Sequence, residues 1–222
     1  MTATANIIDL SSKPSGYFTW SRPEMLEFVP NTATRILDVG CGAGLFGKSI
    51  KARQHAEVWG IEYNPTAAEQ AQANLDKVLL DDVYEVIPAL PDNYFDCIVF
   101  NDVLEHLTDP YMVLQLVKKN LTDNGVVACS IPNVRHYQTL FKLVFRKEWK
   151  YEDAGVLDKT HLRFFTKKSM RDMFSALDYE ILKLKGLDRA TSKIARAASV
   201  ATLGWLSDTL YSQYGCQVRP RR

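Results

Sequence analysis

The chain has 222 residues, of which 46% are apolar, 11% aromatic and 24% charged, and its formal net charge is +1. These values are ordinary for a globular protein with a sizeable core, and they exclude collagen-like, coiled-coil and disordered chains. There is no apolar run of about 18 residues, so we expect no transmembrane helix. The amino-terminal segment lacks the basic and apolar stretches of a signal peptide.

Cysteine usage and charge distribution bear on the surroundings of the protein. The four cysteines are far apart and form no CxxC pair, which predicts neither a zinc site nor a disulfide framework. We therefore expect a cytoplasmic protein. Residues 1–133 carry 9 Lys and Arg against 17 Asp and Glu, whereas residues 134–222 carry 18 against 9. This basic second half indicates either an anionic partner or solvated helix faces.

Strand-like and helix-like runs alternate up to Pro132, which is the pattern of a parallel sheet with crossover helices. Strands are predicted for five apolar runs, at 35–39, 57–62, 77–82, 95–102 and 126–131. Helices are predicted between them, at 45–53, from Asn64 towards Leu75, and at 111–121 with a left-handed cap at Asn124-Gly125.

This alternation ends after Pro132. Residues 134–165 combine aromatic and cationic side chains without clear strands, and 139–149 is typical of an amphipathic helix. Helices are then predicted for 167–176 and 190–207, and strands for 179–186 and 214–219. Because no repeat or linker occurs, we predict a single domain over residues 1–222.

The segment ILDVGCGAGLFG (36–47) runs from a predicted strand into three closely spaced glycines, Gly40, Gly42 and Gly44. Such glycines let the backbone turn tightly and come close to a ligand. The segment also matches the GxGxxG pattern of dinucleotide sites, but Asp38 just before the loop would repel a pyrophosphate. A carboxylate there suits a cationic ligand without phosphate. S-adenosylmethionine, with its sulfonium and ammonium groups, fits this description.

Polar residues follow the next three predicted strands at their carboxyl ends, where open α/β sheets bind ligands. Glu62 ends the second strand, at a place where an acid can accept both hydroxyls of a ribose. Asp81-Asp82-Val83 ends the third strand, where an adenine amino group could be met, and Asn101-Asp102 ends the fourth. Each acid alone is as typical of a helix cap, but suitable groups at every strand end indicate a binding site.

DVGCGAG (38–44), Glu62 and FDCIVFNDVLEHLTDP (95–110) together resemble the class I S-adenosylmethionine-dependent methyltransferases, and among them the ubiquinone-methyltransferase-like group. PNVRHY and THLRFFT are similar to members associated with bacterial cell-surface polysaccharide and glycolipid synthesis. The resemblance implies an α/β fold with a doubly wound, Rossmann-like sheet of seven strands in the order 3-2-1-4-5-7-6. Strand 7 is antiparallel, and a substrate-side insertion follows strand 5.

The resemblance also implies which residues bind the cofactor. Its loop comprises Asp38, Gly40, Cys41, Gly42 and Gly44. The remaining positions are Glu62 with Tyr63 for the ribose, Asp82 and Val83 for the adenine, and Asn101 for the methionine end. Family members usually have Gly where this chain has Asp81. The residue that contacts the adenine is therefore predicted only to within one position. Residues 1–30 resemble an amino-terminal cofactor lid, with Tyr17 and Arg22 as contacts.

Histidine is the expected proton acceptor if the methyl group goes to a hydroxyl. His106 follows the fourth strand beside the methionine end, and we predict it to be the general base, with packing of the loop as the alternative. His161, in the insertion, is the second catalytic candidate. Asp102, Glu105 and His106 form a D-x-x-E-H cluster that resembles a divalent-metal site of quinone methyltransferases, but we predict no metal here.

We predict that residues 134–165 recognise the acceptor through Arg135, His136, His161 and Arg163 and that this site or its rim is electropositive. The expected acceptor is a small molecule or a lipid-linked anion. Basic amphipathic helices at 139–149 and 192–206 allow peripheral contact with the inner face of a membrane, or else pack onto the core. No nucleic-acid module occurs, and the oligomeric state stays open.

The predicted function is therefore S-adenosylmethionine-dependent O-methylation of a sugar, glycolipid or other small molecule. Nothing in the cofactor motifs identifies the acceptor atom, so N- or C-methylation is an alternative. A different class of function is also open, in which the chain binds the cofactor without catalysis as a regulatory subunit.

Overall fold

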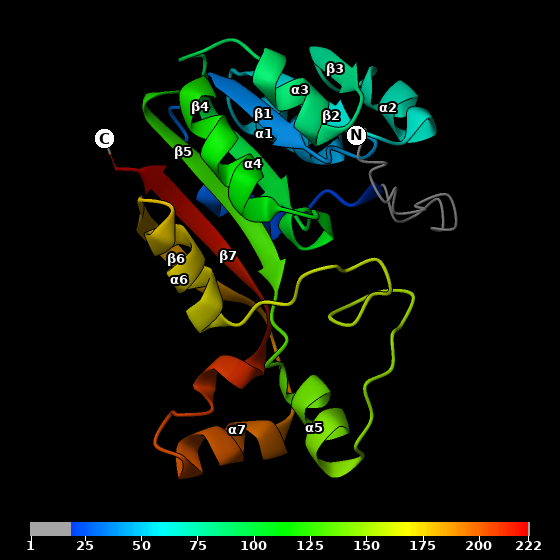
Figure 1. Cartoon of the computed structure of the whole chain (residues 1–222), viewed down its shortest axis with the longest axis vertical. Coiled ribbons are helices and arrows are strands. Elements are labelled where there is room, and N and C mark those ends of the chain that lie inside the picture. Colours follow the sequence, from blue (N-terminus) through cyan, green and yellow to red (C-terminus); the bar gives the residue numbers. More distant parts are fainter. Residues whose placement is uncertain (1–18, 222) are drawn as a thin grey trace, which may run out of the picture.

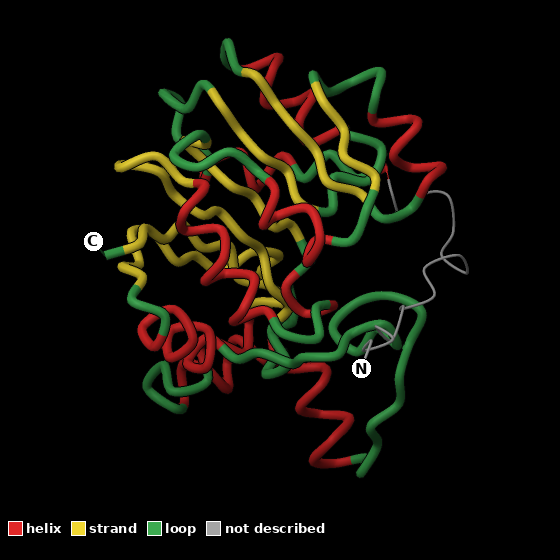
Figure 2. Tube along the Cα trace, turned by 45° about the horizontal axis from the view of Figure 1, so that its top comes forward, coloured by secondary structure: helices red, strands yellow, loops and turns green. Residues whose placement is uncertain are grey.

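The computed structural model describes residues 19–221, which form a seven-stranded sheet covered by helices on both faces (Figures 1 and 2). The strand order is β3-β2-β1-β4-β5-β7-β6, and β7 runs antiparallel to β5 and β6, as predicted. The strands are β1 (Arg35–Val39), β2 (Glu57–Glu62), β3 (Lys77–Leu80), β4 (Phe95–Asn101), β5 (Leu121–Pro132), β6 (Tyr179–Arg189) and β7 (Tyr211–Pro220).

The helices cover the sheet in two groups. The α-helices are α1 (Leu45–Arg53), α2 (Pro65–Ala71), α3 (Val83–Ala89), α4 (Pro110–Leu116), α5 (Tyr137–Phe145), α6 (Lys167–Ala176) and α7 (Lys193–Ala201). On one face, α3, α4 and α6 pack against β-strand side chains such as Leu37 and Ile98. On the other face, α1, α2 and the 3-10 helix η3 (Pro23–Phe28) pack against Ile36 and Val58. Both faces of the central strands are thus buried, which explains their continuous apolar runs.

The helix starts follow from local side-chain chemistry. Asn64 accepts a hydrogen bond from Ala67 N at the start of α2, and Asp109 accepts one from Met112 N at the start of α4. In both helices a proline occupies the first position, where no N–H partner is needed. Thr166 caps α6 through a capping box with Ser169. These caps fix where the three helices begin.

Several predicted boundaries are wrong. Asn124-Gly125 is no helix cap: α4 ends at Leu116, a 3-10 turn follows, and both residues lie within β5, next to an irregular register with β4. The helix α3 was not predicted because its first turns follow Asp81-Asp82 directly and contain Pro88. The predicted helix from Asn64 ends at Ala71, short of Leu75.

The region after β5 extends beyond the sheet at the lower end of Figure 1. Residues 139–149 form a helix only in part, since α5 ends at Phe145. Likewise α7 ends at Ala201, and the predicted helix over 190–207 continues as turns into the 3-10 helix η6 (Ser207–Leu210). The described residues contain no helix that is both long and apolar enough to cross a membrane.

Candidate active site

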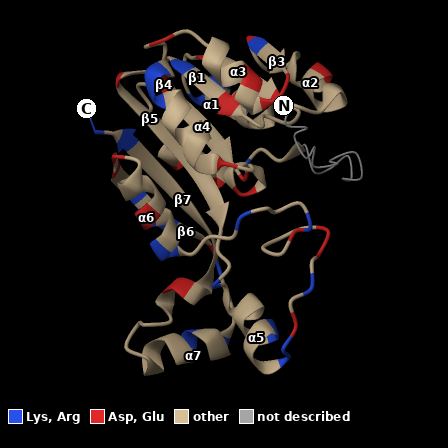
Figure 3. Ribbon diagram, viewed as in Figure 1, with Lys and Arg blue, Asp and Glu red and all other residues tan. Residues whose placement is uncertain are grey.

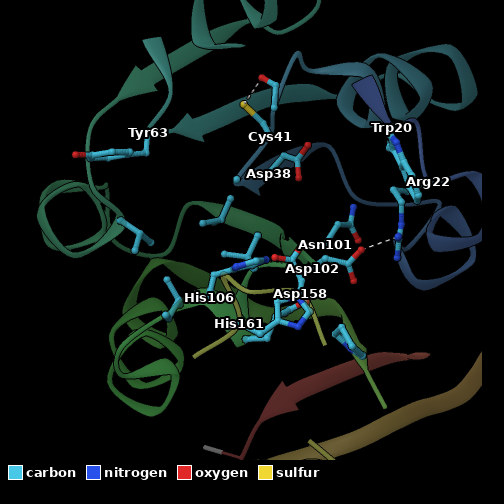
Figure 4. A pocket seen from close by; sticks show the side chains of 18 of the residues that line it. Trp20, Arg22, Asp38, Cys41, Tyr63, Asn101, Asp102, His106, Asp158 and His161 are labelled. Atoms are coloured by element: carbon cyan, nitrogen blue, oxygen red, sulfur yellow. Dashed lines mark hydrogen bonds and ion pairs between the residues drawn. The ribbon is translucent and has the colours of Figure 1, made fainter. Parts of the chain in front are cut away.

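A cavity of about 560 Å³ opens at the carboxyl ends of β1, β2 and β4 (Figure 4). The glycine loop and the residues after β2 and β3 line one part of it. The residues after β4, the segment 154–161, and the adjoining ends of β6 and β7 line the other part. The cavity is therefore lined by segments from both halves of the chain, as in an enzyme that binds two substrates next to each other.

The glycine loop has the tight geometry that its sequence predicts. Gly40 and Gly42 both line the cavity and have φ angles of 69° and 53°. A Cβ atom on Gly40 would lie 2.6 Å from Cγ2 of Val103, so no larger residue fits there. Gly44, in contrast, does not line the cavity. It begins α1 and packs closely against Leu75 of the segment after α2, so its role is structural.

Glu62 organises this loop. Its Oε2 atom accepts a hydrogen bond of 2.8 Å from the backbone N–H of Gly42, and its Oε1 atom accepts one of 2.8 Å from Asn64. Burial raises the pKa of this carboxyl, whereas the N–H groups of Asn64 and Gly42 act to lower it. The side chain lines the cavity, so the carboxylate both fixes the loop and faces a ligand.

Asp38 and Asn101 present buried polar atoms that bind nothing else in the described chain. Burial, and then the charge of Glu62, raises the pKa of Asp38 to about 8. Asp38 Oδ2 and both side-chain polar atoms of Asn101 have no hydrogen-bond partner among residues 19–221. Such atoms are costly in a folded protein unless a ligand satisfies them. A ligand with cationic and hydrogen-bonding groups fits these two residues.

The residues predicted beside ribose and adenine also line the cavity. Tyr63 is half exposed at its edge, Val83 is buried in its wall, and Asp82 caps α3 by accepting from Tyr84 N at 2.9 Å. Cys41 lines the cavity too, and its buried thiol has a raised pKa because of desolvation. Asp82 is thus a helix cap as well as a cavity residue. That it contacts the adenine stays a prediction.

The amino-terminal segment crosses the cavity through Trp20 and Arg22, while Tyr17 lies outside the described residues. Arg22 is buried and pairs with Asp102 at 2.6 Å, and its guanidinium also donates to Ser130 and Gln213. Ser130 in turn donates to Asp102 at 2.8 Å. This network ties the segment to β5 and β7, and it already engages the guanidinium that we predicted for the cofactor carboxylate.

His106 and His161 meet at the other part of the cavity, with ring centroids 4.7 Å apart (Figure 4). His106 Nδ1 lies 3.1 Å from the carbonyl oxygen of Thr160, and His161 Nδ1 lies 3.1 Å from that of Val156. A carbonyl oxygen can only accept, so both Nδ1 atoms carry a proton, and in the neutral form of either ring the lone pair lies on Nε2. Burial lowers the pKa of His106 to about 4, so it is neutral at pH 7.

Glu105 lies beneath the two imidazoles and is buried. Its Oε1 atom is 3.9 Å from Nε2 of His161, and desolvation, followed by the charge of Asp102, raises the pKa of this carboxyl. Ligand atoms of Glu105, His106 and His161 all lie within 4.8 Å of one another, close enough to share a metal ion. Asp102, the first acid of the D-x-x-E-H cluster, pairs with Arg22 instead. Our expectation of no metal is untested.

Of the four residues predicted to recognise the acceptor, only His161 lines the cavity. Arg135 pairs with Asp208 at 2.7 Å and stacks on Trp205, while His136 is buried at the start of α5 against Tyr137. Arg163 is exposed and donates to the carbonyl of Thr108. The structure therefore places these three outside the cavity, because local partners engage each of them.

The insertion reaches the cavity with neutral and acidic residues, not with its cations. Ala154, Gly155, Val156 and Asp158 line it beside His161. Among the described lining residues, Arg22 is the one cation, against eight carboxylates: Asp38, Glu62, Asp81, Asp82, Asp102, Glu105, Asp158 and Asp188. The prediction of an electropositive site is therefore wrong for the lining, whereas the predicted electropositive rim stays a prediction. The uneven distribution of charge along the sequence did not predict the charge of the cavity, because no lysine or arginine of residues 134–221 lines it.

Sequence analysis missed several cavity residues that only the fold brings there, namely Trp20, Thr108, Asp158, Asp188, Ser212 and Gln213. Asp188 ends β6 and Gln213 begins β7, at the same edge as the ends of β4 and β5 because β7 is antiparallel. The predicted antiparallel strand could have located these two. No local signal marks Asp158, whose carboxylate accepts from Thr160 within a buried turn.

Residues 17–184 match a family model described as a methyltransferase domain. The chain belongs to this methyltransferase family. It is 32% identical over 117 residues to a ubiquinone biosynthesis O-methyltransferase of Psychrobacter cryohalolentis, which covers 50% of this chain and 45% of that protein. It is 26% identical over 166 residues to the protein of the same name from Cereibacter sphaeroides, and this match covers 72% of this chain and 65% of that protein. The chain thus spans about half to two thirds of these relatives.

A solved S-adenosylmethionine-dependent methyltransferase of Archaeoglobus fulgidus has the same fold, with a TM-score of 0.67 and 18% identity over 88% of this chain and 89% of that one. The described chain is accordingly a methyltransferase domain with the fold of an S-adenosylmethionine-dependent methyltransferase, in agreement with the predicted enzyme class and cofactor. The cavity fits this cofactor. Asp38 and Asn101 present polar atoms without partners among the described residues, and Glu62 lines the cavity; their roles toward the cationic end and the ribose of the cofactor stay predictions.

Proposed function

We propose that the enzyme transfers the methyl group of S-adenosylmethionine to a hydroxyl oxygen of a sugar, a glycolipid or another small molecule. The observation that carries this proposal is the pair of adjacent imidazoles of His106 and His161, which line the cavity together. A hydroxyl acceptor must lose its proton during the transfer, and neutral imidazole is suited to receive it. The names of the relatives also favour oxygen as the acceptor atom.

When bound, the cofactor supplies a methyl group already activated by the sulfonium. The chain's own residues then position the acceptor and accept its proton. The Nδ1–H of His106 is held by the carbonyl of Thr160, so its Nε2 atom is the proton acceptor in our proposal. His161, fixed in the same way by Val156, packs edge-on against it and either orients His106 or accepts the proton itself.

The proposal assigns distinct tasks to the flanking segments of one domain over residues 1–222. Residues 1–30 close over the cofactor, supported by the position of Trp20 and Arg22 in the cavity wall. Residues 134–165 recognise the acceptor, supported by the lining segment 154–161. The carboxylates around the histidines favour a neutral polyhydroxy group as the reacting part of the acceptor. Any anionic part, such as the phosphate of a lipid-linked sugar, would then lie outside the cavity near Arg163.

We also propose that the enzyme works in the cytoplasm, in peripheral contact with a membrane, as expected for polysaccharide or glycolipid synthesis. Support comes from the basic second half of the chain and its exposed apolar side chains. N- or C-methylation of a similar acceptor remains the alternative, because no lining residue reads the acceptor atom directly. A non-catalytic regulatory role is disfavoured by the histidine pair that lines the cavity at the acceptor end.

The test is incubation of the enzyme with S-adenosylmethionine and a panel of sugars, nucleotide sugars and lipid-linked sugars, followed by mass spectrometry. A mass increase of one methyl group, with the product resistant to conditions that cleave esters, supports a methyl ether. Methylation confined to amines or to carbon would overturn the O-methyl assignment. Binding of S-adenosylhomocysteine without turnover on any member of the panel, or on a crude lipid extract, would favour the regulatory role.

A further inference from the structure

Large apolar side chains are exposed on the two helices that extend beyond the sheet. Ile194 of α7 is 84% exposed and Leu203 of the following turn is 97% exposed, while Phe145 of α5 is 75% exposed. Phe141, Val144, Val200 and Trp205 are exposed as well. Single exposed apolar residues are ordinary on a protein surface, but seven on two segments at one end of the molecule indicate a partner.

In these two helices small or polar side chains are buried and large apolar side chains are exposed, the opposite of a core helix. The residues of α7 that are buried are Ala195 and Ser199, whereas Ile194 and Val200 face outward. In α5 the buried residue is Thr139. A helix that stabilised the fold by its apolar face would show the opposite arrangement. The outward apolar residues therefore do not serve the core of the described chain.

The charges on the same two segments have one sign. Residues 134–147 contain Arg135, Lys142, Arg146 and Lys147 and no carboxylate, and residues 189–207 contain Arg189, Lys193 and Arg196 and no carboxylate (Figure 3). Arg135 joins the two segments by pairing with Asp208 while its guanidinium lies 5.4 Å from the Trp205 ring centroid.

We propose that these exposed apolar residues form a docking face for an anionic lipid bilayer. Arg135 and Lys142 are paired with Asp208 and Glu152, while Arg146, Lys147, Lys193 and Arg196 leave the two segments with an excess of positive charge. Apolar side chains that include tryptophan, mixed with such an excess of lysine and arginine, enter the interfacial region of an anionic bilayer and attract its headgroups. A second copy of this chain is the less suitable occupant, because the same cations would meet across a symmetric interface. The docking face consists of Phe141, Val144, Phe145, Ile194, Val200, Leu203 and Trp205.

The segments that carry the docking face leave the sheet at the active site. Pro132, Asp188 and Ser212 line the cavity, and the chain leaves the sheet at these points for α5 and for α7. A bilayer at the docking face therefore lies beside the acceptor part of the cavity. The inference rests on the proposed function in one respect: among the proposed acceptors, a lipid-linked one is the class that a docked bilayer would present to the cavity.

The test is vesicle flotation of the full-length protein with phosphatidylcholine vesicles, with or without phosphatidylglycerol. We expect binding to the anionic vesicles, weakening with salt, and little binding to the neutral ones. Phe145→Glu combined with Ile194→Glu should lower the partition coefficient at least tenfold. Lys193→Glu combined with Arg196→Glu should lower it by about fivefold for each cation lost. Met112→Glu, on the half-exposed Met112 of α4, is the matched control and should bind as the wild type does.

Three results would overturn the docking face: no flotation of the wild type, equal flotation of the Phe145→Glu/Ile194→Glu variant, or light scattering that shows a dimer split by this variant without lipid binding. Calorimetry with S-adenosylhomocysteine shows whether each variant is folded, and equal affinities are expected. Vesicle binding without methylation of any acceptor would contradict the proposed function and leave the docking face standing.

Discussion

The cofactor part of the cavity and the region of α5 and α7 depart from a stability-optimised protein in opposite ways. At the carboxyl ends of β1 and β4, buried polar atoms of Asp38 and Asn101 lack hydrogen-bond partners in the described chain. Around α5 and α7, polar groups are paired, as in Arg135 with Asp208, whereas apolar side chains such as Ile194 are exposed.

Each departure points to the chemistry of what is missing. Unsatisfied buried polar atoms are costly and indicate a polar ligand, here the cofactor. Exposed apolar side chains are tolerated singly, but together they indicate an apolar partner. The histidine pair of the acceptor part belongs to neither region, because His106 follows β4 and His161 precedes α6.

The largest expected effect lies at the histidine pair, His106 and His161. His106→Ala should lower kcat by about 10²–10⁴-fold if His106 accepts the proton, while binding of S-adenosylhomocysteine stays within about threefold. His55→Ala, which removes a histidine outside the cavity, is the control and should keep full activity. Full activity of His106→Ala on the identified acceptor would contradict the base assignment and move attention to His161.

A smaller effect is expected in the cofactor region. Glu62→Ala removes the acceptor of two backbone hydrogen bonds, from Gly42 and Asn64, and should weaken cofactor binding by about 1.5–3 kcal/mol, or about 10- to 150-fold. Glu62→Gln keeps one acceptor oxygen and should lose less. Titration calorimetry with S-adenosylhomocysteine measures both, and equal losses for the two variants would contradict a role of the carboxylate in ordering the loop.

The raised pKa of Asp38 predicts a trade-off between stability and binding. Its carboxyl titrates near 4 in the unfolded chain and near 8 in the folded one, so ionisation of the unfolded chain lowers the stability of the ligand-free protein as pH rises from about 4 to 8. Asp38→Asn should remove this slope and stabilise the protein by about 1–3 kcal/mol at pH 8, yet weaken cofactor binding. Denaturant unfolding at pH 5 and pH 8 is the measurement. A constant difference between the two proteins at both values would contradict the assignment.

The smallest effect is expected in the second region. Ile194→Ala should change the free energy of unfolding by no more than about 0.5 kcal/mol, because the side chain is exposed. The same substitution at Ile98, buried in β4, should cost about 2–5 kcal/mol. Urea denaturation of the two variants compares them directly. A large loss for Ile194→Ala would show that α7 packs on a surface through this residue.

The part of the site that local sequence could predict is the cofactor half. Strand starts were correct for β1, β2, β3, β4 and β6. Of the predicted loop and strand-end residues all but Gly44 line the cavity, namely Asp38, Gly40, Cys41, Gly42, Glu62, Tyr63, Asp82, Val83 and Asn101. The acceptor half was predicted less well. Arg135, His136 and Arg163 were chosen by composition, and each is engaged by a neighbour outside the cavity.

The sequence by itself determined the sheet, the glycine turn and the helix caps, because each depends on a few adjacent residues: an apolar run, a glycine, or a polar side chain before a proline. Only the tertiary structure decided which charges line the cavity, that His161 meets His106, and which side of α5 and α7 is exposed. An amphipathic pattern shows that a helix has two unlike faces. Which of them is buried depends on the surface that the rest of the chain places opposite.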